Sequence, residues 1–253
     1  NTVLLPAWAA ATFWFLRSYK TRGAGWAALA GFGAAACMLG KYWSVFLLAG
    51  LVIAALIDRR RGRYFHSAAP WITVAVGLIA IAPHLVWLSH HFSEPFAYAM
   101  YVHGEKPFGA AIFSVLGYLA GSFGYVVVPV AIVAGLLIFH SSPRRVAVDI
   151  AWPEDPDRRL AAAAFWAPLL LPAVAALVSG IEITSLWSMS AWTLLPVLLL
   201  SPPAIAINDI DLRRILAAAV IFPLVMLVAS PAIAILVQRN GPPPNSAQAA
   251  PLA

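Results

Sequence analysis

Long apolar runs alternate with short polar connectors along the whole 253-residue chain. Several runs reach the length that crosses a bilayer as a helix, roughly 20 residues, and they carry almost no charge. Eight such segments are expected, at residues 1–16, 23–40, 42–57, 67–89, 110–139, 160–179, 184–207 and 215–237. The pattern therefore predicts an all-α fold, a polytopic transmembrane helix bundle with about eight membrane segments.

Three of these segments have unusual lengths. Residues 23–40 and 42–57 are short for full spans, so they form either two spans or a re-entrant hairpin. Residues 110–139 would extend about 45 Å as one helix, which exceeds a hydrocarbon core of roughly 30 Å. That helix is expected to tilt steeply or to begin in the membrane interface.

Gly117, Gly121 and Gly124 mark one face of the long segment. Small residues at such spacing let a second membrane helix approach closely, so this face is predicted to pack against another helix.

The chain divides into a transmembrane domain, residues 1–239, and a proline-rich tail, residues 240–253, which is expected to be disordered. The stretch 140–159 is predicted to be a short solvated connector. Because Asn1 already lies inside an apolar run, the chain is expected to be an N-terminally truncated part of a longer membrane protein.

Composition supports a membrane protein, with 62% hydrophobic residues, 10% charged residues and a mean hydropathy of +0.85. The formal charge of +6 could indicate nucleic-acid binding. The basic residues nevertheless occur in short clusters between apolar runs, as in the connectors of membrane proteins, so nucleic acid is not an expected partner. The single Cys37 excludes a disulfide framework.

Charge is distributed unequally between the two sets of connectors that alternating helices create. One set holds Arg17, Lys20, Arg22, Arg59, Arg60, Arg61, Arg63, Arg144, Arg145, Arg158, Arg159, Arg213 and Arg214, and the other holds Lys41, Lys106 and Arg239. Cytoplasmic connectors concentrate Lys and Arg, so the first set is predicted to face the cytoplasm. The loop 90–106 and the turn 180–184 are then expected on the outer face.

Lys41 stands between two apolar segments on the predicted outer face. A lysine there is costly unless its ammonium reaches the interface, forms a pair or binds an anion. Simple extension toward water would satisfy it, and the alternative is an ammonium that holds a lipid-linked phosphate. Tyr42 and Trp43 beside it also fit an interfacial aromatic belt.

Four of the six histidines fall within about twenty residues, at His84, His90, His91 and His103. Their spacing does not match a zinc helix, and no Cys or carboxylate completes a ligand set, so no metal site is expected. They are predicted to hydrogen-bond substrate or lipid head groups. His84 follows Pro83 within an apolar run and needs a partner, which could be structural or could be substrate.

Glu94, Glu105 and Glu182 are the carboxylates of the predicted outer face. General acid or base chemistry on a sugar donor requires a carboxylate within reach, although each of these could equally be a solvated loop charge. Trp187 and Trp192 follow Glu182 and could stack on a sugar or belong to the aromatic belt. No P-loop, Rossmann, nucleophile-elbow or triad motif is present.

Several motifs together resemble bacterial members of glycosyltransferase family 39, the group of dolichyl-phosphate-mannose protein mannosyltransferases and lipid A aminoarabinose transferases. They are Asn1-Thr2-Val3-Leu4-Leu5, Leu39-Gly40-Lys41-Tyr42, the basic loop 59–64 and Pro83-His84-Leu85-Val86-Trp87. The resemblance covers roughly residues 1–110. It implies a GT-C fold whose active site faces the periplasm of the bacterial inner membrane, with a polyprenyl-phosphate sugar as donor and a lipid, glycan or protein of the cell envelope as acceptor.

In that family the catalytic acidic residue lies in an outer loop upstream of the position that matches Asn1, so the resemblance assigns no catalytic residue to this chain. The residues expected to bind substrate are Lys41, Tyr42, His84, Trp87, His90, His91, Glu94, His103, Glu182, Trp187 and Trp192. No cofactor is expected, and the sequence does not decide whether a divalent metal takes part. The alternative prediction is a polytopic transporter or lipid flippase, for which charges inside the long runs would be typical.

Overall fold

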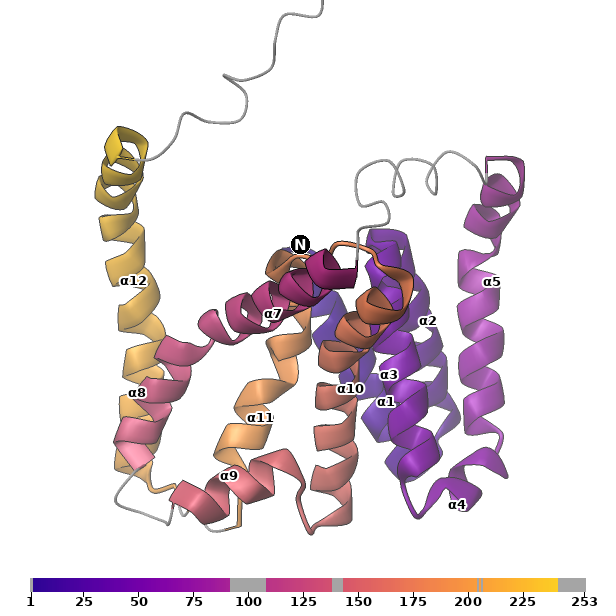
Figure 1. Ribbon diagram of the computed structural model, residues 1–253. Helices are drawn as coiled ribbons and strands as arrows, with labels where there is room; N and C mark the ends of the chain where they lie inside the picture. Colours follow the sequence, from indigo (N-terminus) through magenta and orange to yellow (C-terminus); the bar gives the residue numbers. More distant parts are fainter. Residues whose placement is uncertain (1, 92–107, 138–142, 204, 206, 241–253) are drawn as a thin grey trace, which may run out of the picture.

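The computed structural model describes residues 2–91, 108–137, 143–203, 205 and 207–240 (Figure 1). Every regular element within these ranges is a helix, which confirms the all-α membrane bundle. Glu94 and His103 lie outside the described residues.

Helices of very different lengths make up the chain. Its first half contains α1 (Leu4–Thr21), α2 (Ala24–Gly40), the 3-10 turn η1 (Tyr42–Ser44), α3 (Val45–Ile57), α4 (Arg61–Phe65) and α5 (Ala69–His90). The second half contains α7 (Phe108–Gly124), α8 (Val127–Leu137), α9 (Pro143–Ala151), α10 (Pro156–Ser179), η2 (Ser185–Trp187), η3 (Met189–Leu194), α11 (Leu195–Leu200) and α12 (Asp209–Asn240).

The long elements alternate in direction, so their connectors gather at two opposite ends of the bundle (Figure 1). At the lower end in this view lie the α1–α2 turn, α4, α9 and the starts of α10 and α12, which carry the thirteen clustered basic residues. We call it the arginine end. The upper end holds the α2–α3 connection, the end of α5 and residues 180–188, and we call it the aromatic end. Which compartment each end faces stays a prediction.

Close backbone contact joins α2 to α5. α2 packs between α1 and α5, and α3 packs against α10. A Cβ added at Gly31 would lie 2.3 Å from the Thr73 carbonyl oxygen and 2.9 Å from the Gly77 nitrogen of α5. The absence of a side chain at Gly31 therefore sets the spacing between α2 and α5.

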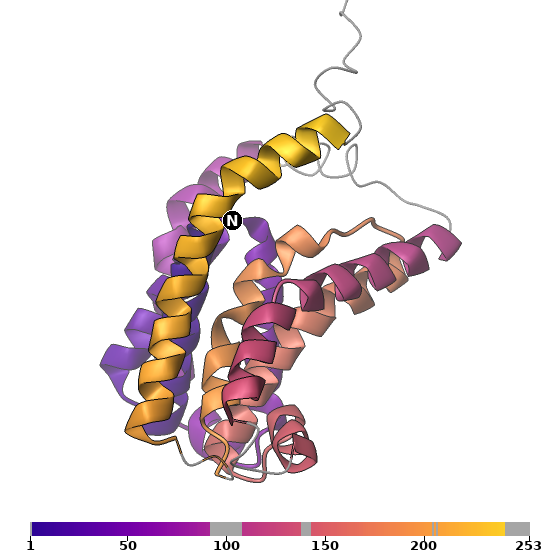
Figure 2. The ribbon, with the colours of Figure 1, turned by 90° about the vertical axis from the view of Figure 1, so that its left-hand side faces the viewer.

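The core lies among α1, α2, α3, α10 and the 3-10 segment that follows it. Its large buried side chains are Trp8, Leu47, Phe165, Leu169 and Leu198. In contrast, the membrane-length windows of α5 and α12 contain no fully buried residue, and α12 stands at the periphery beside α8 (Figures 1 and 2). Apolar surface that no protein covers is what lipid-facing helices present.

Among the described residues, three helices are long and apolar enough to cross a membrane: α5, α10 and α12. The bent pair α7 and α8 would make a fourth. The expected count of about eight segments is therefore not confirmed. α2 and the segment 42–57 are shorter apolar helices, so the structure leaves the choice between two spans and a re-entrant hairpin open.

The prediction of a single long helix over residues 110–139 is wrong. Two helices, α7 and α8, meet at an angle of 41° near Tyr125 and Val126, so the extra length is absorbed by a break (Figure 2). The segment expected at 184–207 is not confirmed as a full span: its described residues form the 3-10 turns η2 and η3 and the six-residue α11, and Met189–Leu200 is one of the shorter apolar helices. The connector 140–159 contains the additional helix α9.

The glycine face of α7 is used at one position. A Cβ at Gly121 would lie 2.6 Å from the Ser185 hydroxyl oxygen, so this glycine allows η2 to pack closely. At Gly117 and Gly124 an added Cβ would meet nothing within 4 Å among the described residues. The predicted helix-packing role is therefore confirmed for Gly121 alone.

Candidate functional site

The connection between α2 and α3 at the aromatic end is fixed by hydrogen bonds. α2 ends at Gly40, Lys41 adopts an extended backbone, and its amide donates to the Cys37 carbonyl at 3.1 Å. The buried Ser44 hydroxyl donates to the same carbonyl at 2.8 Å and accepts the Trp8 indole N–H at 3.0 Å. The backbone that carries Lys41 is thus held rigidly against α1 and α2.

The Lys41 side chain lies against a tryptophan from a distant part of the chain. Its Nζ is 5.0 Å from the ring centroid of Trp187 in η2, which is a cation–π distance. Trp187 in turn packs edge-on against Trp43, with 4.6 Å between centroids. Partial burial lowers the pKa of the Lys41 ammonium, because water no longer fully solvates the charge. A nearby anion would oppose that shift.

Tyr42 and His84 meet next to Lys41. The Tyr42 hydroxyl and the His84 Nε2 are 2.7 Å apart, so the half-buried His84 has the polar partner that it requires. The His84 ring stacks on Trp87 at 5.5 Å, and Trp87 stacks on His91 at 4.7 Å. The spacing of three and four residues on α5 places these rings along one face of the helix.

Two other residues predicted to bind substrate lie at the edge of the group formed by Lys41, Tyr42 and His84. His90 is exposed at the last position of α5 and takes no part in the ring stack, and Glu182 is exposed in the loop after α10. That loop is tied to α7, because Ser114 accepts the Ile183 amide at 2.9 Å and donates to the Ile183 carbonyl at 3.1 Å.

Trp192 belongs to the core and lies 5.5 Å from both Phe123 and Phe165 between ring centroids. The structure does not bring it to Lys41, and its buried indole N–H has no hydrogen-bond acceptor within the described part of the chain.

Five of the predicted residues therefore converge at the aromatic end: Lys41, Tyr42, His84, Trp87 and Trp187, with His91 extending the stack. Sequence reasoning missed the support from Trp8 and Ser44, whose contact joins residues 36 positions apart. No local signal in the sequence marks that pair.

Over the residues that the structure describes, no group of three or more His, Cys, Asp or Glu side chains could hold a metal ion.

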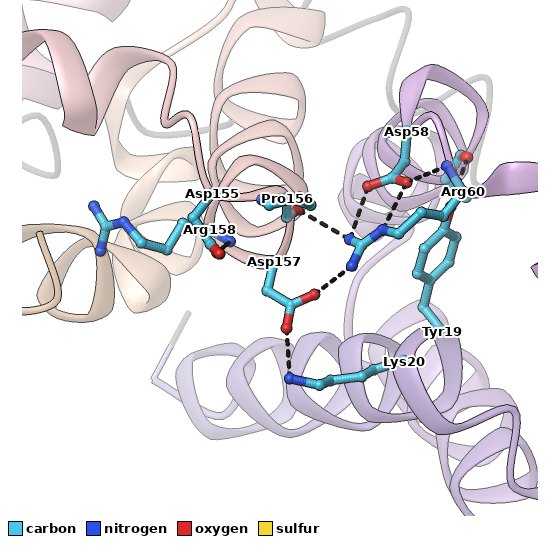
Figure 3. A network of polar contacts seen from close by, with 9 residues as sticks. Tyr19, Lys20, Asp58, Arg60, Asp155, Pro156, Asp157 and Arg158 are labelled. Carbon is cyan, nitrogen blue, oxygen red and sulfur yellow. Dashed lines mark hydrogen bonds and ion pairs between the residues drawn. The ribbon is translucent and has the colours of Figure 1, made fainter. Parts of the chain in front are cut away.

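The arginine end contains a different kind of polar cluster (Figure 3). Arg60 binds the Asp58 carboxylate through two nitrogens at 3.0 and 3.1 Å and Asp157 at 2.5 Å, and Lys20 also binds Asp157 at 2.5 Å. Burial alone would raise the pKa of Asp58, but the hydrogen bonds from Arg60 outweigh it and lower that pKa below the ordinary 3.8. These pairs tie α1, α3 and α10 together.

A separate ion pair and a helix cap fix the start of α10. The Asp155 side chain caps the helix by accepting the Arg158 amide at 2.9 Å, while the Arg158 guanidinium binds Asp149 of α9 and the Ser201 hydroxyl. Most carboxylates of the arginine end thus serve helix termini and ion pairs, which is a structural role.

Residues 1–87 match the family model described as dolichyl-phosphate-mannose-protein mannosyltransferase. The match confirms the family resemblance over this region, which contains α1 to α4 and most of α5, including Lys41, Tyr42, His84 and Trp87. It supports a multi-pass membrane glycosyltransferase of the GT-C type. Searches of curated proteins and of solved structures returned no match to the chain.

Proposed function

We propose, from the match of residues 1–87 to the dolichyl-phosphate-mannose-protein mannosyltransferase family, that the aromatic end binds a polyprenyl-phosphate sugar. The sugar is then transferred to a lipid, glycan or protein acceptor. In this proposal the aromatic end faces the periplasm and the arginine end faces the cytoplasm of a bacterial inner membrane. The sidedness rests on the thirteen basic residues gathered at one end of the bundle.

The observation that carries the proposal is the position of Lys41. Its ammonium is half-buried against Trp187 and is adjacent in the chain to Tyr42, which is hydrogen-bonded to His84. A cation in a partly desolvated place interacts more strongly with an anion than one in water. Lys41 is therefore well placed to bind the phosphate of the donor and to stabilise the negative charge that develops as this phosphate leaves the sugar.

The Tyr42 and His84 pair adds hydrogen-bonding capacity beside that ammonium. If the His84 Nε2–H donates to the Tyr42 oxygen, the tyrosine hydroxyl hydrogen is left to donate to a phosphate oxygen. In the opposite arrangement Tyr42 donates to His84, and Nδ1 carries the imidazole hydrogen.

The other aromatic and polar residues are assigned to the sugar and to the acceptor. Trp87, His90 and His91 follow His84 at the end of α5 and are proposed to contact the substrate. The same role is proposed for Glu94 and His103, which lie outside the described residues. Glu182, Trp187 and Trp192 form the acceptor side, with Trp192 supporting from the core. Displacement at the anomeric carbon also needs a base for the acceptor hydroxyl, and we assign that role to no residue of this chain.

The transporter or flippase alternative is not favoured, because the family match is to a glycosyltransferase. It would share the lipid-linked ligand but would release the sugar still attached to its phosphate. Transfer of labelled sugar to an acceptor separates the two activities.

The test is the Lys41→Met variant of the full-length protein in membranes, supplied with radiolabelled polyprenyl-phosphate sugars. Removing one electrostatic stabiliser of a leaving group is expected to lower transfer about 100-fold. Lys41→Arg keeps the charge and should retain more activity than Lys41→Met. Arg145→Met, which removes an exposed cation of α9, is the matched control and should transfer at the wild-type rate. Wild-type transfer by a correctly inserted Lys41→Met protein would refute the assignment.

A further inference from the structure

A cavity of about 270 Å³ lies at the arginine end, lined by none of the residues of the proposed donor site. Four cationic side chains line it, from Lys20, Arg22, Arg60 and Arg63, together with the Asp157 carboxylate and the Tyr64 ring. Four cations against one carboxylate give the cavity a strongly positive character. The proposed sugar transfer does not use it.

Two of these cations are already paired within the protein and two are not. Lys20 and Arg60 share Asp157, and Arg60 also binds Asp58. For the Arg22 and Arg63 side chains the described residues provide neither an ion pair nor a hydrogen bond, and both side chains are exposed. The cavity therefore presents two guanidinium groups that can bind a further anion.

The backbone of Arg22 indicates that its side chain is used. Arg22 ends α1 in the left-handed conformation, at φ 57°, and is the one described non-glycine residue with a positive φ. Glycine is the usual residue at such a helix end, because a Cβ is disfavoured there. An arginine in this disfavoured conformation, with Gly23 directly after it, is consistent with a role for the guanidinium in the cavity that it lines.

An apolar groove begins where the cationic cavity ends. It encloses about 330 Å³ between α3 and α5, above α1 and α2, and its lining includes Phe15, Leu51, Val74 and Ile81. Tyr64, which is buried and stacks on Tyr19 with 4.6 Å between centroids, lines both the groove and the cationic cavity. An anion bound by Arg22 and Arg63 thus lies next to an apolar channel that leads into the bundle.

We propose that this composite site binds an anionic phospholipid of the leaflet at the arginine end. Its phosphate pairs with Arg22 and Arg63, and one acyl chain occupies the groove between α3 and α5. Charge complementarity favours an anionic head group, because its net negative charge attracts the neighbouring cations more strongly than a zwitterionic head group, whose own cation offsets its phosphate. Guanidinium groups suit the phosphate because they donate two parallel hydrogen bonds.

The experiment measures lipid retention by the purified full-length protein, reconstituted in nanodiscs of phosphatidylcholine with a minor fraction of phosphatidylglycerol. Bound phosphatidylglycerol is quantified by native mass spectrometry. The variant is R22G/R63Q, in which glycine relieves the left-handed strain while it removes the charge. At the strength typical of basic residues near anionic lipid, the loss of two cations should weaken retention roughly 30-fold.

The matched control is Arg59→Gln, which removes an exposed cation of the same end that does not line the cavity. It should retain phosphatidylglycerol as the wild type does. The thermal midpoint of R22G/R63Q in pure phosphatidylcholine should equal or exceed that of the wild type, so a loss of lipid would not reflect misfolding. Equal retention by R22G/R63Q and wild type would overturn the proposal.

Two further arms identify the ligand. Inorganic phosphate, added alone to protein in detergent, should raise the thermal midpoint far less than phosphatidylglycerol does. Equal effects would indicate a soluble anion and overturn the lipid assignment.

The Lys41→Met variant should retain phosphatidylglycerol as the wild type does. Loss of retention in Lys41→Met would place the lipid phosphate at the aromatic end and would also overturn the proposal.

Discussion

The two ends of the bundle use charge in opposite ways. At the arginine end most carboxylates are bound to a guanidinium, an ammonium or a helix terminus, as in the Arg60 contacts with Asp58 and Asp157. At the aromatic end the Lys41 ammonium lies over the Trp187 ring, which packs against Trp43, and Lys41 is adjacent in the chain to Tyr42, the partner of His84. The end of the bundle with more charged residues is thus not the end at which we propose that the sugar donor binds.

The two ends differ because their charged side chains have different partners. A charge that is fully paired within the protein stabilises the arrangement of helices and has little left for a ligand. A half-buried cation such as Lys41 can bind an anion in addition to its contacts within the protein, because partial desolvation strengthens its interaction with an opposite charge. Substitution of the paired charges at the arginine end, such as Asp58 and Arg60, should therefore change stability, and substitution of Lys41 or its neighbours at the aromatic end should change transfer.

The largest stability effect is expected for Gly31→Ala, which tests whether helix packing brings the aromatic end together. The new Cβ would meet backbone atoms of α5, which cannot move without separating α5 from α2. Overpacking of this kind costs about 3 kcal/mol. The thermal midpoint in detergent should fall, and donor binding should weaken because Tyr42 and His84 move apart.

Gly25→Ala is the control for this substitution, since the same helix leaves open space around that position. Alanine favours a helix over glycine, so Gly25→Ala should be neutral or slightly stabilising. A Gly31→Ala protein as stable as Gly25→Ala would contradict the packing role of Gly31.

A smaller loss is expected for Asp58→Asn at the arginine end. The side chain of Asp58 is only 2% exposed and accepts charged hydrogen bonds from Arg60. Their loss should lower the free energy of unfolding by about 2 kcal/mol. Transfer per folded molecule should stay unchanged. A large loss of transfer without a loss of stability would contradict the proposal that this ion pair stabilises the fold and takes no part in transfer.

The same pair predicts a pH dependence. Because the pKa of Asp58 is lowered in the folded protein, its stabilising contribution is complete above the unfolded value of about 3.8 and is lost as pH falls through the folded pKa. The difference in unfolding free energy between wild type and Asp58→Asn should be constant near neutral pH and should narrow in acid. A difference that widens in acid would contradict the role given to Arg60.

The smallest effect is expected for Tyr42→Phe, which removes the hydroxyl that binds His84. One hydrogen bond contributes about 1 kcal/mol, so the KM for the lipid donor should rise roughly fivefold, with little change in thermal midpoint. Tyr125→Phe is the control, because its hydroxyl makes only a long 3.4 Å contact with Ser185. Equal KM values for the two variants would contradict the proposed role of the Tyr42 and His84 pair in binding the lipid donor.

Much of the layout could be predicted from the sequence because membrane helices leave strong local signals. The alternation of apolar runs with basic connectors predicted an all-α bundle and two unlike ends. The motif at Pro83-His84 and Trp87 indicated the side chains that stack on α5, since positions three and four apart share a helix face.

The errors arose where tertiary contacts override local pattern. Residues 184–207 are apolar enough for a span, yet their first part forms 3-10 turns that carry Trp187 to Lys41 and bury Trp192 in the core. The break between α7 and α8 leaves no glycine or proline signal distinct from those inside intact helices. The contact between Lys20 and Asp157 joins residues 137 positions apart, and no local pattern specifies such a pair.

The central claim is that the two ends face opposite sides of the membrane, with donor binding at the aromatic end. Single cysteines at positions 182 and 59, introduced as E182C and R59C into a Cys37→Ala protein, test it by labelling intact cells with a membrane-impermeant maleimide. Both positions are exposed. The account predicts that E182C reacts from outside and that R59C reacts only after permeabilisation. Labelling of R59C in intact cells, with E182C protected, would contradict it.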